Sequence, residues 1–251
     1  MIDYGLHGKV ALVTGASGGI GRAGALAFAH SGAAVLVSDV NDAGGAETVA
    51  MIVAAGGRAA YRRCDVSDAA QVRAMVAAAV ETFGRLDCAF NNAGINVMAA
   101  DEYEEDNWDR SVAINLKGVM LCMREAAEVM LRQGSGAIVN TASINGLIGN
   151  PGQPAYTATK HGVIGLTRHG ALRWAKAGIR VNAVCPGVIE TPMTAPLLAN
   201  PERKQVLDAM TPMGRLGQAD EVAQAVVWLC SDAASFVTGH PMVIDGGATA
   251  I

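Results

Sequence analysis

The 251-residue sequence predicts an α/β protein in which helices flank a doubly wound parallel sheet of the Rossmann type. Short apolar runs alternate with longer amphipathic stretches, which is the pattern of strands joined by helices. Most runs are apolar throughout, as in strands that are buried on both faces. A glycine-rich turn follows the first run directly, where this architecture binds ligands.

Seven strands and six helical stretches account for most of the chain. The strands are predicted over residues 10–14, 34–38, 59–64, 86–91, 137–141, 180–184 and 242–245. The helices are predicted over residues 19–31, 41–55, 68–83, about 106–132, 154–177 and 219–230. Asp68 is placed to cap the third helix, and Pro154 suits the first turn of the fifth.

No linker, repeat or low-complexity tract interrupts the pattern, so residues 1–251 are expected to form one domain. The most irregular segment covers residues 187–200, with Pro192 and Pro196 inside it and Pro201 just beyond. It directly follows a strand, and ligands bind beyond the carboxyl ends of parallel strands. We therefore expect residues 187–212 to form a lid over the substrate.

The composition excludes several classes of partner. The formal net charge is −4 and no block of lysine or arginine occurs, so nucleic acid and anionic membrane are poor partners. No apolar run has the length of a membrane span, and the first residues show no signal-peptide pattern. The five cysteines are scattered without a C-x-x-C spacing, which predicts no disulfide framework and no metal site. A soluble protein of a reducing cytoplasm is expected.

The glycine-rich turn predicts a dinucleotide site. Glycines at 15, 18, 19 and 21 allow a tight turn, and the N-terminus of the following helix attracts a pyrophosphate. Asp39 ends the second strand, about twenty residues later, where an acid accepts hydrogen bonds from the adenosine ribose. Its charge would repel a 2′-phosphate. Ser17, Gly18 and Val40 supply no cation to offset this, and Arg22 lies inside the first helix, where it is expected to face solvent. NAD is therefore favoured over NADP, although a structural turn and a helix cap are the alternatives.

Tyr156 and Lys160 are four residues apart, so they share one face of a helix. A neighbouring ammonium lowers the pKa of a phenol and fits it for proton transfer near neutral pH. Ser143 lies shortly before them. The same spacing also occurs by chance on solvated helices, so the pair gains weight only beside the glycine-rich turn.

Together these motifs resemble the short-chain dehydrogenase/reductase family over essentially the whole chain. The matching residues are Thr14-Gly15-x3-Gly19-Ile20-Gly21, Asp65-Val66, Asn91-Asn92-Ala93-Gly94, Asn115, Ser143, Tyr156-x3-Lys160, Pro186-Gly187-Val188-Ile189-Glu190-Thr191 and Asp245-Gly246-Gly247. Each motif is modestly specific, whereas their joint occurrence in this order is highly specific.

The resemblance implies a role for each matching residue. Tyr156 is the general acid/base, Lys160 lowers its pKa and binds the nicotinamide ribose, and Ser143 holds the substrate oxygen. Asn115 keeps a water for proton relay. The implied cofactor-binding residues are Gly15, Ser17, Gly18, Ile20, Asp39, Asp65, Val66, Asn91, Asn92, Gly94, Tyr156, Lys160, Ile189 and Thr191. The resemblance also implies a homotetramer, paired through helices that begin near Leu116 and Pro154.

The expected pocket walls are mostly apolar, with no arginine or lysine placed to grip a carboxylate or phosphate. They are Ile95, Met98, Asn145, Leu147, Ile148, Gln153, Met193, Leu197 and Leu198. We expect a small-molecule substrate, namely a neutral, fairly hydrophobic secondary alcohol or its ketone. The alternatives are an NADPH-dependent biosynthetic reductase of the 3-oxoacyl type and a non-catalytic dinucleotide sensor.

Overall fold

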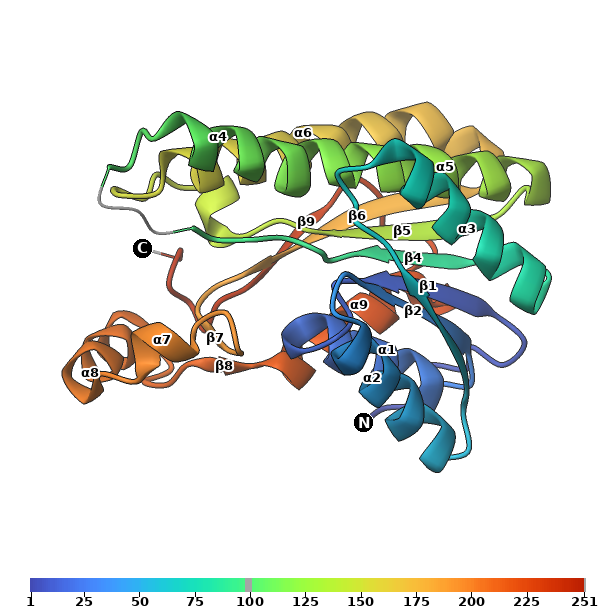
Figure 1. Ribbon diagram of the computed structural model, residues 1–251, viewed down its shortest axis with the longest axis horizontal. Coiled ribbons are helices and arrows are strands. Elements are labelled where there is room, and N and C mark those ends of the chain that lie inside the picture. The colour runs from blue at the N-terminus through green and yellow to red at the C-terminus, as the bar shows by residue number, and fades with distance from the viewer. Residues whose placement is uncertain (98–100, 251) are drawn as a thin grey trace.

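The computed structural model describes residues 1–97 and 101–250, and a seven-stranded sheet forms its centre (Figure 1). The strand order is β3-β2-β1-β4-β5-β6-β9, and every neighbouring pair is parallel. The strands are β1 (Val10–Thr14), β2 (Ala34–Asp39), β3 (Arg58–Arg63), β4 (Cys88–Asn91), β5 (Gly136–Thr141), β6 (Ile179–Pro186) and β9 (Pro241–Ile244). The order reverses between β1 and β4, so the predicted doubly wound Rossmann-type sheet is confirmed.

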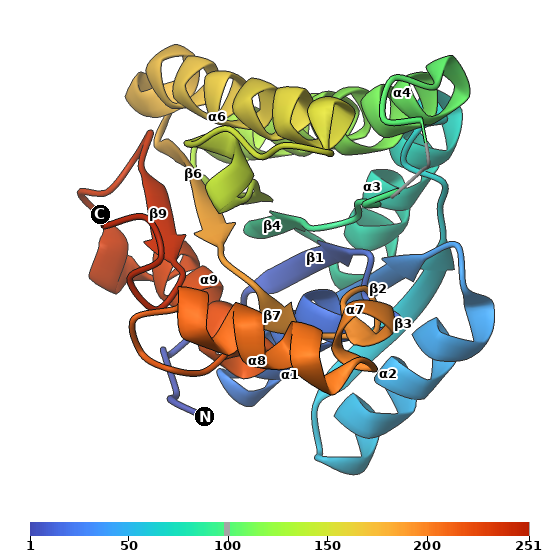
Figure 2. The ribbon, with the colours of Figure 1, turned by 90° about the vertical axis from the view of Figure 1, so that its left-hand side faces the viewer.

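Helices cover both faces of the sheet (Figures 1 and 2). On one face lie α1 (Gly19–His30), α2 (Asp42–Ala54) and α9 (Ala219–Cys230). On the other lie α3 (Ala69–Phe83), α4 (Glu105–Ser111), α5 (Val119–Gln133) and α6 (Pro154–Trp174). Short 3-10 helices follow at η2 (Ile144–Gly146), η3 (Ala175–Ala177) and η4 (Asp232–Ala234). All six predicted helical stretches are present, and their ends agree or differ by at most three residues.

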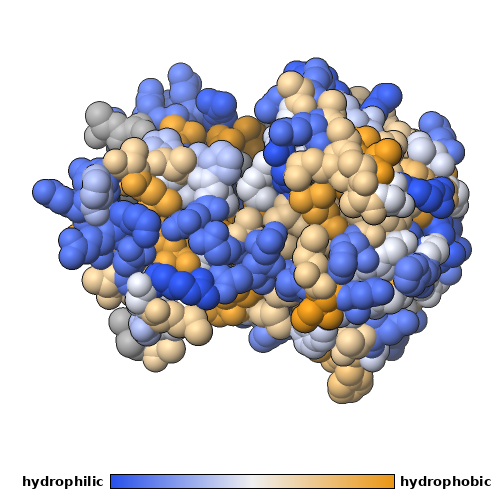
Figure 3. Space-filling model, turned by 90° about the horizontal axis from the view of Figure 1, so that it is seen from below, coloured by the Kyte–Doolittle hydropathy of each residue, from blue (hydrophilic) through white to orange (hydrophobic). Residues whose placement is uncertain are grey.

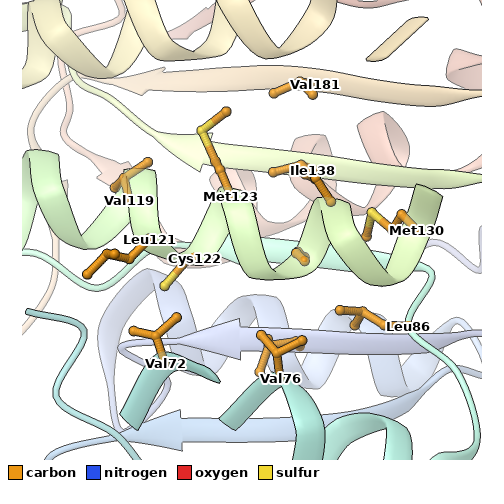
Figure 4. Close-up of a cluster of buried hydrophobic side chains, with 14 of the residues drawn as sticks. Val72, Val76, Leu86, Val119, Leu121, Cys122, Met123, Met130, Ile138 and Val181 are labelled. Carbon is orange, nitrogen blue, oxygen red and sulfur yellow. The ribbon is translucent and has the colours of Figure 1, made fainter. Parts of the chain in front are cut away.

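The apolar face of α5 shows how the layers pack. Figure 4 shows Met123 and Met130 of α5 beside Ile138 of β5, while Cys122 points toward Val72 of α3. Each of these side chains is at most 3% exposed. Burial of apolar surface at about 25 cal/mol per Å² holds such layers together.

The long helical stretch predicted from about residue 106 is continuous but not uniform. Between α4 and α5 the chain forms a π-helix, η1 (Val112–Gly118). A π-turn widens the helix locally, and such turns are frequent at functional sites. Here it carries the buried Asn115.

Strand β3 departs from the expectation of runs that are buried on both faces. Its sequence RAAYRR is exposed at both ends, because β3 is the edge strand and pairs only with β2. An edge strand needs fewer apolar side chains, and charged ones discourage pairing with another chain.

The segment 187–212 is more regular than its prolines indicate. It contains β7 (Ile189–Glu190), α7 (Ala195–Leu198) and α8 (Pro201–Met210), and β7 pairs with β8 (Gly217–Gln218). Asn200 accepts hydrogen bonds from the backbone of Glu202 and Arg203, and Pro201 occupies the first turn of α8. These are ordinary start signals of a helix, so α8 could have been predicted from the sequence, whereas no helix was expected there. Neither α7 nor α8 buries a residue, and both stand apart from the sheet in Figure 1.

Candidate active site

A cavity of about 1360 Å³ opens at the carboxyl ends of the central strands. Its walls come from the turns that follow β1, β2, β4, β5 and β6, and from α7 and α8. In Figure 3 the surface is hollowed between the part that carries α7 and α8 and the body of the molecule. This is the place where the reversal of strand order leaves a crevice.

Nearly all of the predicted cofactor-binding residues meet at this cavity. Those that line it are Gly15, Ser17, Gly18, Ile20, Asp39, Asp65, Val66, Asn92, Gly94, Tyr156, Lys160, Ile189 and Thr191. Asn91 does not line it. Asn91 is 2% exposed, and its Nδ2 donates to Asn140 Oδ1 of the neighbouring strand at 2.9 Å, so it supports the sheet.

The glycine-rich turn fits a pyrophosphate. Helix α1 begins at Gly19 and no side chain caps its first turn, which leaves backbone N–H groups free for an anion. Gly15 has φ +66°, and a Cβ there would lie 2.8 Å from Ala93 Cα. A Cβ at Gly21 would lie 2.0 Å from Gly15 O. Gly15 is therefore needed for the close approach of this turn to the residues after β4, and Gly21 for the close approach of α1 to the turn.

Asp39 lies at the end of β2 with its carboxylate against the glycine-rich turn. Oδ2 accepts a hydrogen bond from Ser17 N at 3.0 Å, and Oδ1 accepts one from Asn41 N at 2.9 Å. Both bonds fix the carboxylate at the wall of the cavity. An ionised carboxylate retains further lone pairs, so it can also accept from a ribose hydroxyl.

Two arginines near Asp39 lie differently from what the sequence predicts. Arg22 does not face solvent: its guanidinium donates to Ser17 O at 2.6 Å and pairs with Glu47. Arg63 lies opposite Asp39 in the register of β2 and β3, lines the cavity and pairs with Asp42 at 3.0 Å. The expectation of no cation near Asp39 was therefore wrong, because strand pairing brings in a residue that is distant in sequence.

Ser143, Tyr156 and Lys160 share one wall of the cavity. Tyr156 and Lys160 belong to α6, and Lys160 Nζ lies 5.3 Å from the centre of the Tyr156 ring. The ammonium donates to Thr141 O at 2.7 Å, at the end of β5. Ser143 follows two residues later, and its Oγ accepts from Asn145 N at 3.1 Å. The structure thus brings the predicted proton-transfer residues together.

Burial dominates the ionisation of this pair. It raises the pKa of Tyr156 above its usual value, and the adjacent Ser143 hydroxyl acts in the opposite direction. Burial also lowers the pKa of Lys160 to about 8. Lys160 does not offset the effect of burial on the pKa of the phenol. Its Nζ lies 5.3 Å from the ring centre and donates to Thr141 O. A further positive charge in the cavity would lower the pKa of the phenol.

Asn115 lies behind the cavity wall rather than in it. The side chain is fully buried in the π-helix and makes two hydrogen bonds to one residue, Ile95. Nδ2 donates to Ile95 O and Oδ1 accepts from Ile95 N, both at 2.8 Å. Asn115 therefore holds the turn that follows β4, next to Gly94 and Lys160.

The outer end of the cavity matches the expected walls in part. Ile95, Asn145, Ile148, Gln153, Met193 and Leu197 line it, whereas Leu147 and Leu198 do not, and Met98 lies outside the described residues. Leu207 and Met210 of α8 also line it, and their spacing of three on a helix was an available signal.

Two arginines, Arg110 and Arg203, line the cavity as well. The expectation of walls without arginine was therefore wrong. They lie on α4 and α8, and only the tertiary fold brings these helices to one cavity.

In the described ranges, 1–97 and 101–250, no group of three or more histidine, cysteine or acidic residues is placed to hold a metal ion. A search of the helices in the same ranges found none with the length and apolar character of a membrane span.

Fold and site together define an oxidoreductase that binds a nicotinamide dinucleotide. Residues 15–249 match the family model described as enoyl-(acyl carrier protein) reductase. The chain belongs to the short-chain dehydrogenase/reductase family, which supports an enzyme with alcohol dehydrogenase activity.

Curated relatives and a solved structure cover nearly the whole chain. A cyclohexanol dehydrogenase of Acinetobacter sp. strain SE19 is 46% identical over 97% of this chain and 96% of its own length. A 2,5-dichloro-2,5-cyclohexadiene-1,4-diol dehydrogenase of Sphingobium indicum is 45% identical, over 98% and 99%. A 3-oxoacyl-[acyl-carrier-protein] reductase of Thermotoga maritima is 42% identical, over 96% and 98%. The crystal structure of a gluconate 5-dehydrogenase from Burkholderia cenocepacia with NADP and tartrate superposes with a TM-score of 0.94, at 35% identity, over 99% and 98%.

Proposed function

We propose that this protein catalyses the NAD-dependent oxidation of a neutral, fairly hydrophobic secondary alcohol on a ring, and the reverse reduction of the ketone. The observation that carries the proposal is the convergence of Ser143, Tyr156 and Lys160 on one wall of a cavity that also contains the glycine-rich turn. Cyclic alcohols are named for the relatives that are 45–46% identical, which supports the ring.

The side chains of the site have distinct roles in this proposal. A bound oxidised nicotinamide would supply the hydride acceptor for the carbinol carbon and a positive charge. The Tyr156 side chain, as its phenolate, takes the proton of the alcohol, and Ser143 Oγ hydrogen-bonds the same substrate oxygen. Lys160 holds the positive charge beside the phenol, and Asn115 keeps the turn at Ile95 in place for a proton-relay water.

A preference for NAD over NADP rests on Asp39. Its fixed carboxylate would lie beside a 2′-phosphate, and like charges at ~4 Å repel by roughly 4 kcal/mol at an effective dielectric of ~20. Arg63 acts in the opposite direction, but Asp42 already pairs with it. The preference is therefore expected to be clear but incomplete.

The segment 187–212 is proposed as the lid. Its residues Met193, Leu197 and Leu207 line the cavity, although α7 and α8 bury none of their residues. Closure over the substrate would cover these apolar side chains and exclude water from the reacting atoms.

A homotetramer in the cytoplasm completes the proposal. Leu172 of α6 is 87% exposed and Phe236, close to the edge strand β9, is fully exposed. Large apolar side chains at these two places fit interfaces formed by α6 and by β9. Gel filtration at near-physiological salt should give a species of about four subunits, and a monomer alone would contradict this part.

Two rival functions are less well supported. A reductase for an acyl carrier protein would need a basic docking face, and the chain is net acidic at −4. A sensor without catalysis has no need for Tyr156 and Lys160 at one cavity wall.

The decisive experiment follows absorbance of the reduced nicotinamide with purified protein. Cyclic secondary alcohols, charged sugar acids and acyl thioesters are offered separately, each with NAD or NADP. Turnover of cyclic alcohols with NAD is expected. Faster turnover of the charged sugars or thioesters would contradict the substrate class, and activity with NADP alone would contradict the role of Asp39.

A further inference from the structure

Two amide side chains beside the catalytic wall have no role in the reaction described above. We infer that Asn145 and Gln153 form a second oxygen-binding subsite, so that the preferred substrate carries a further hydroxyl or carbonyl group on its ring. The inference rests on the proposed function, which assigns the reacting oxygen to Ser143 and Tyr156.

The subsite belongs to the same two segments as the catalytic side chains. Asn145 lies in η2, two residues after Ser143, and its backbone N–H donates to Ser143 Oγ at 3.1 Å. Gln153 lies just before α6, three residues ahead of Tyr156. Both amides line the cavity, and Asn145 is only 7% exposed. A ring whose oxygen reaches Ser143 therefore lies beside this pair.

Hydrogen bonds fix the orientation of both amides. Asn145 Nδ2 donates to Gln153 Oε1 at 3.0 Å, and Asn150 Nδ2 donates to the same oxygen at 3.4 Å. Because two donors meet at Oε1, the amide nitrogen of Gln153 is turned away from them. The pair is thus held in one arrangement before substrate binds, which reduces the entropic cost of binding.

One acceptor and one donor of the pair remain available. Asn145 Oδ1 and Gln153 Nε2 make no hydrogen bond to any residue in 1–97 or 101–250. Neither atom is among the buried polar atoms without a partner in these ranges, so each keeps some accessible surface, and both residues line the cavity. The subsite therefore presents a carbonyl oxygen and an N–H group to a ligand.

The chemistry of these two atoms selects the ligand. A hydroxyl can donate to Asn145 Oδ1 and accept from Gln153 Nε2, while a carbonyl oxygen can accept from Gln153 alone. A carboxylate or phosphate would bring negative charge against Asn145 Oδ1. A ring with no second oxygen would cover Asn145 Oδ1 and Gln153 Nε2 and leave both without a hydrogen bond. Such unpaired polar groups make a site discriminate against ligands that lack the second oxygen.

The test compares cyclohexanol with cyclohexane-1,2-diol, 1,3-diol and 1,4-diol, each with NAD and with NADP. We expect kcat/KM for at least one diol to exceed that for cyclohexanol by about tenfold, the value of a satisfied hydrogen-bond pair. Gln153→Met retains the length of the side chain but removes both hydrogen-bonding groups. It should bring the ratio of diol to cyclohexanol kcat/KM close to one.

Gln224→Met is the matched control, because Gln224 lies on α9, bonds to Ile2 N and does not line the cavity. It should keep the wild-type ratio. Equal turnover of cyclohexanol and all diols by the wild type would overturn the subsite and leave the proposed function standing. So would an unchanged ratio in Gln153→Met.

Absence of turnover with every cyclic alcohol and either cofactor would overturn the proposed function, and the subsite with it. If Gln153→Met fails to fold, the substrate ratio of the wild type decides the matter by itself.

Discussion

Tyr156 and Lys160 show how burial changes a prediction made from spacing. They lie one turn apart on α6, yet burial raises the pKa of the phenol and lowers that of the ammonium to about 8. The chain alone therefore keeps Tyr156 protonated at neutral pH. In the proposed reaction, a bound oxidised nicotinamide would bring the positive charge that favours the phenolate, so proton transfer would be coupled to cofactor binding.

Replacement of Tyr156 by phenylalanine tests this residue directly. Tyr156→Phe removes the exchangeable proton and should lower kcat for alcohol oxidation by about 10²–10⁴-fold, the usual contribution of general acid–base catalysis. Binding of the reduced cofactor, measured by its fluorescence, should change little. Tyr103→Phe is the matched control, since Tyr103 is 67% exposed and does not line the cavity. Retained turnover in Tyr156→Phe would refute the proposed mechanism.

Asp39→Asn separates the charge of the carboxylate from its shape. The amide can still accept from Ser17 N, so the turn should keep its structure, while repulsion of a 2′-phosphate is lost. We expect the ratio of kcat/KM for NAD to that for NADP to fall by at least about tenfold. A tenfold change is about 1.4 kcal/mol, which is less than the repulsion of roughly 4 kcal/mol that the substitution removes. Steady-state kinetics with both cofactors measure it. An unchanged ratio together with a lower melting temperature would make Asp39 a structural residue only.

At the scale of single elements, the π-helix η1 decides where Asn115 points. Asn115→Ala would leave the N–H and C=O groups of Ile95 without their partners, which should cost about 2 kcal/mol of unfolding free energy. Asn115→Asp keeps the acceptor for Ile95 N, but it sets a buried carboxylate oxygen against Ile95 O, so its loss should be at least as large. Urea denaturation measures both variants. Wild-type stability in either variant would show that the two bonds to Ile95 are not what stabilises this turn.

Substitution of glycine by alanine should have opposite effects on stability at two helical positions. Gly21→Ala places a Cβ 2.0 Å from Gly15 O, so α1 and the turn must move apart, at a cost of at least about 2 kcal/mol. Gly165→Ala on α6 meets nothing within 4 Å and should stabilise the subunit by about 0.5–1 kcal/mol. Thermal melts report both changes. NAD affinity should fall only in Gly21→Ala, and an equal fall in both would argue against the tight turn.

For the whole molecule, buried thiols predict a loss of stability in alkali. Burial raises the pKa of Cys185 to about 11 and that of Cys64 to about 12, from 9.0, and it also raises that of Cys122. Above pH 9 the unfolded thiols lose their protons while the folded ones keep them, so unfolding free energy falls as pH rises. For Cys185 this effect on the unfolding free energy amounts to about 2 kcal/mol by pH 11.

Lys160 acts in the opposite direction over part of this range. Between pH 8 and 10.5 the unfolded lysine holds a proton that the buried one has lost, so this group alone adds stability as pH rises. Several thiols oppose one lysine, and we expect a net fall between pH 9 and 11. Denaturant midpoints at the two pH values measure it. Cys122→Ala should show a smaller fall than the wild type, and a rise would contradict the buried-thiol account.

Local sequence determined the elements and most of the site. Asp68 predicted the start of α3, and the glycine-rich turn, Asp39 and the Tyr156–Lys160 pair all lie at one cavity. These features depend on contacts within a few residues or on motifs that one loop carries, so they can be read along the chain.

Only the tertiary structure decided which distant residues meet. Arg63 lies beside Asp39 because β3 pairs with β2, and Arg203 reaches the cavity because α8 folds over it. Asn91 turned out to support the sheet, and burial reversed the expected effect on the pKa of Tyr156. Strand register, burial and helix placement are set by the packing of the whole chain, so no local pattern records them.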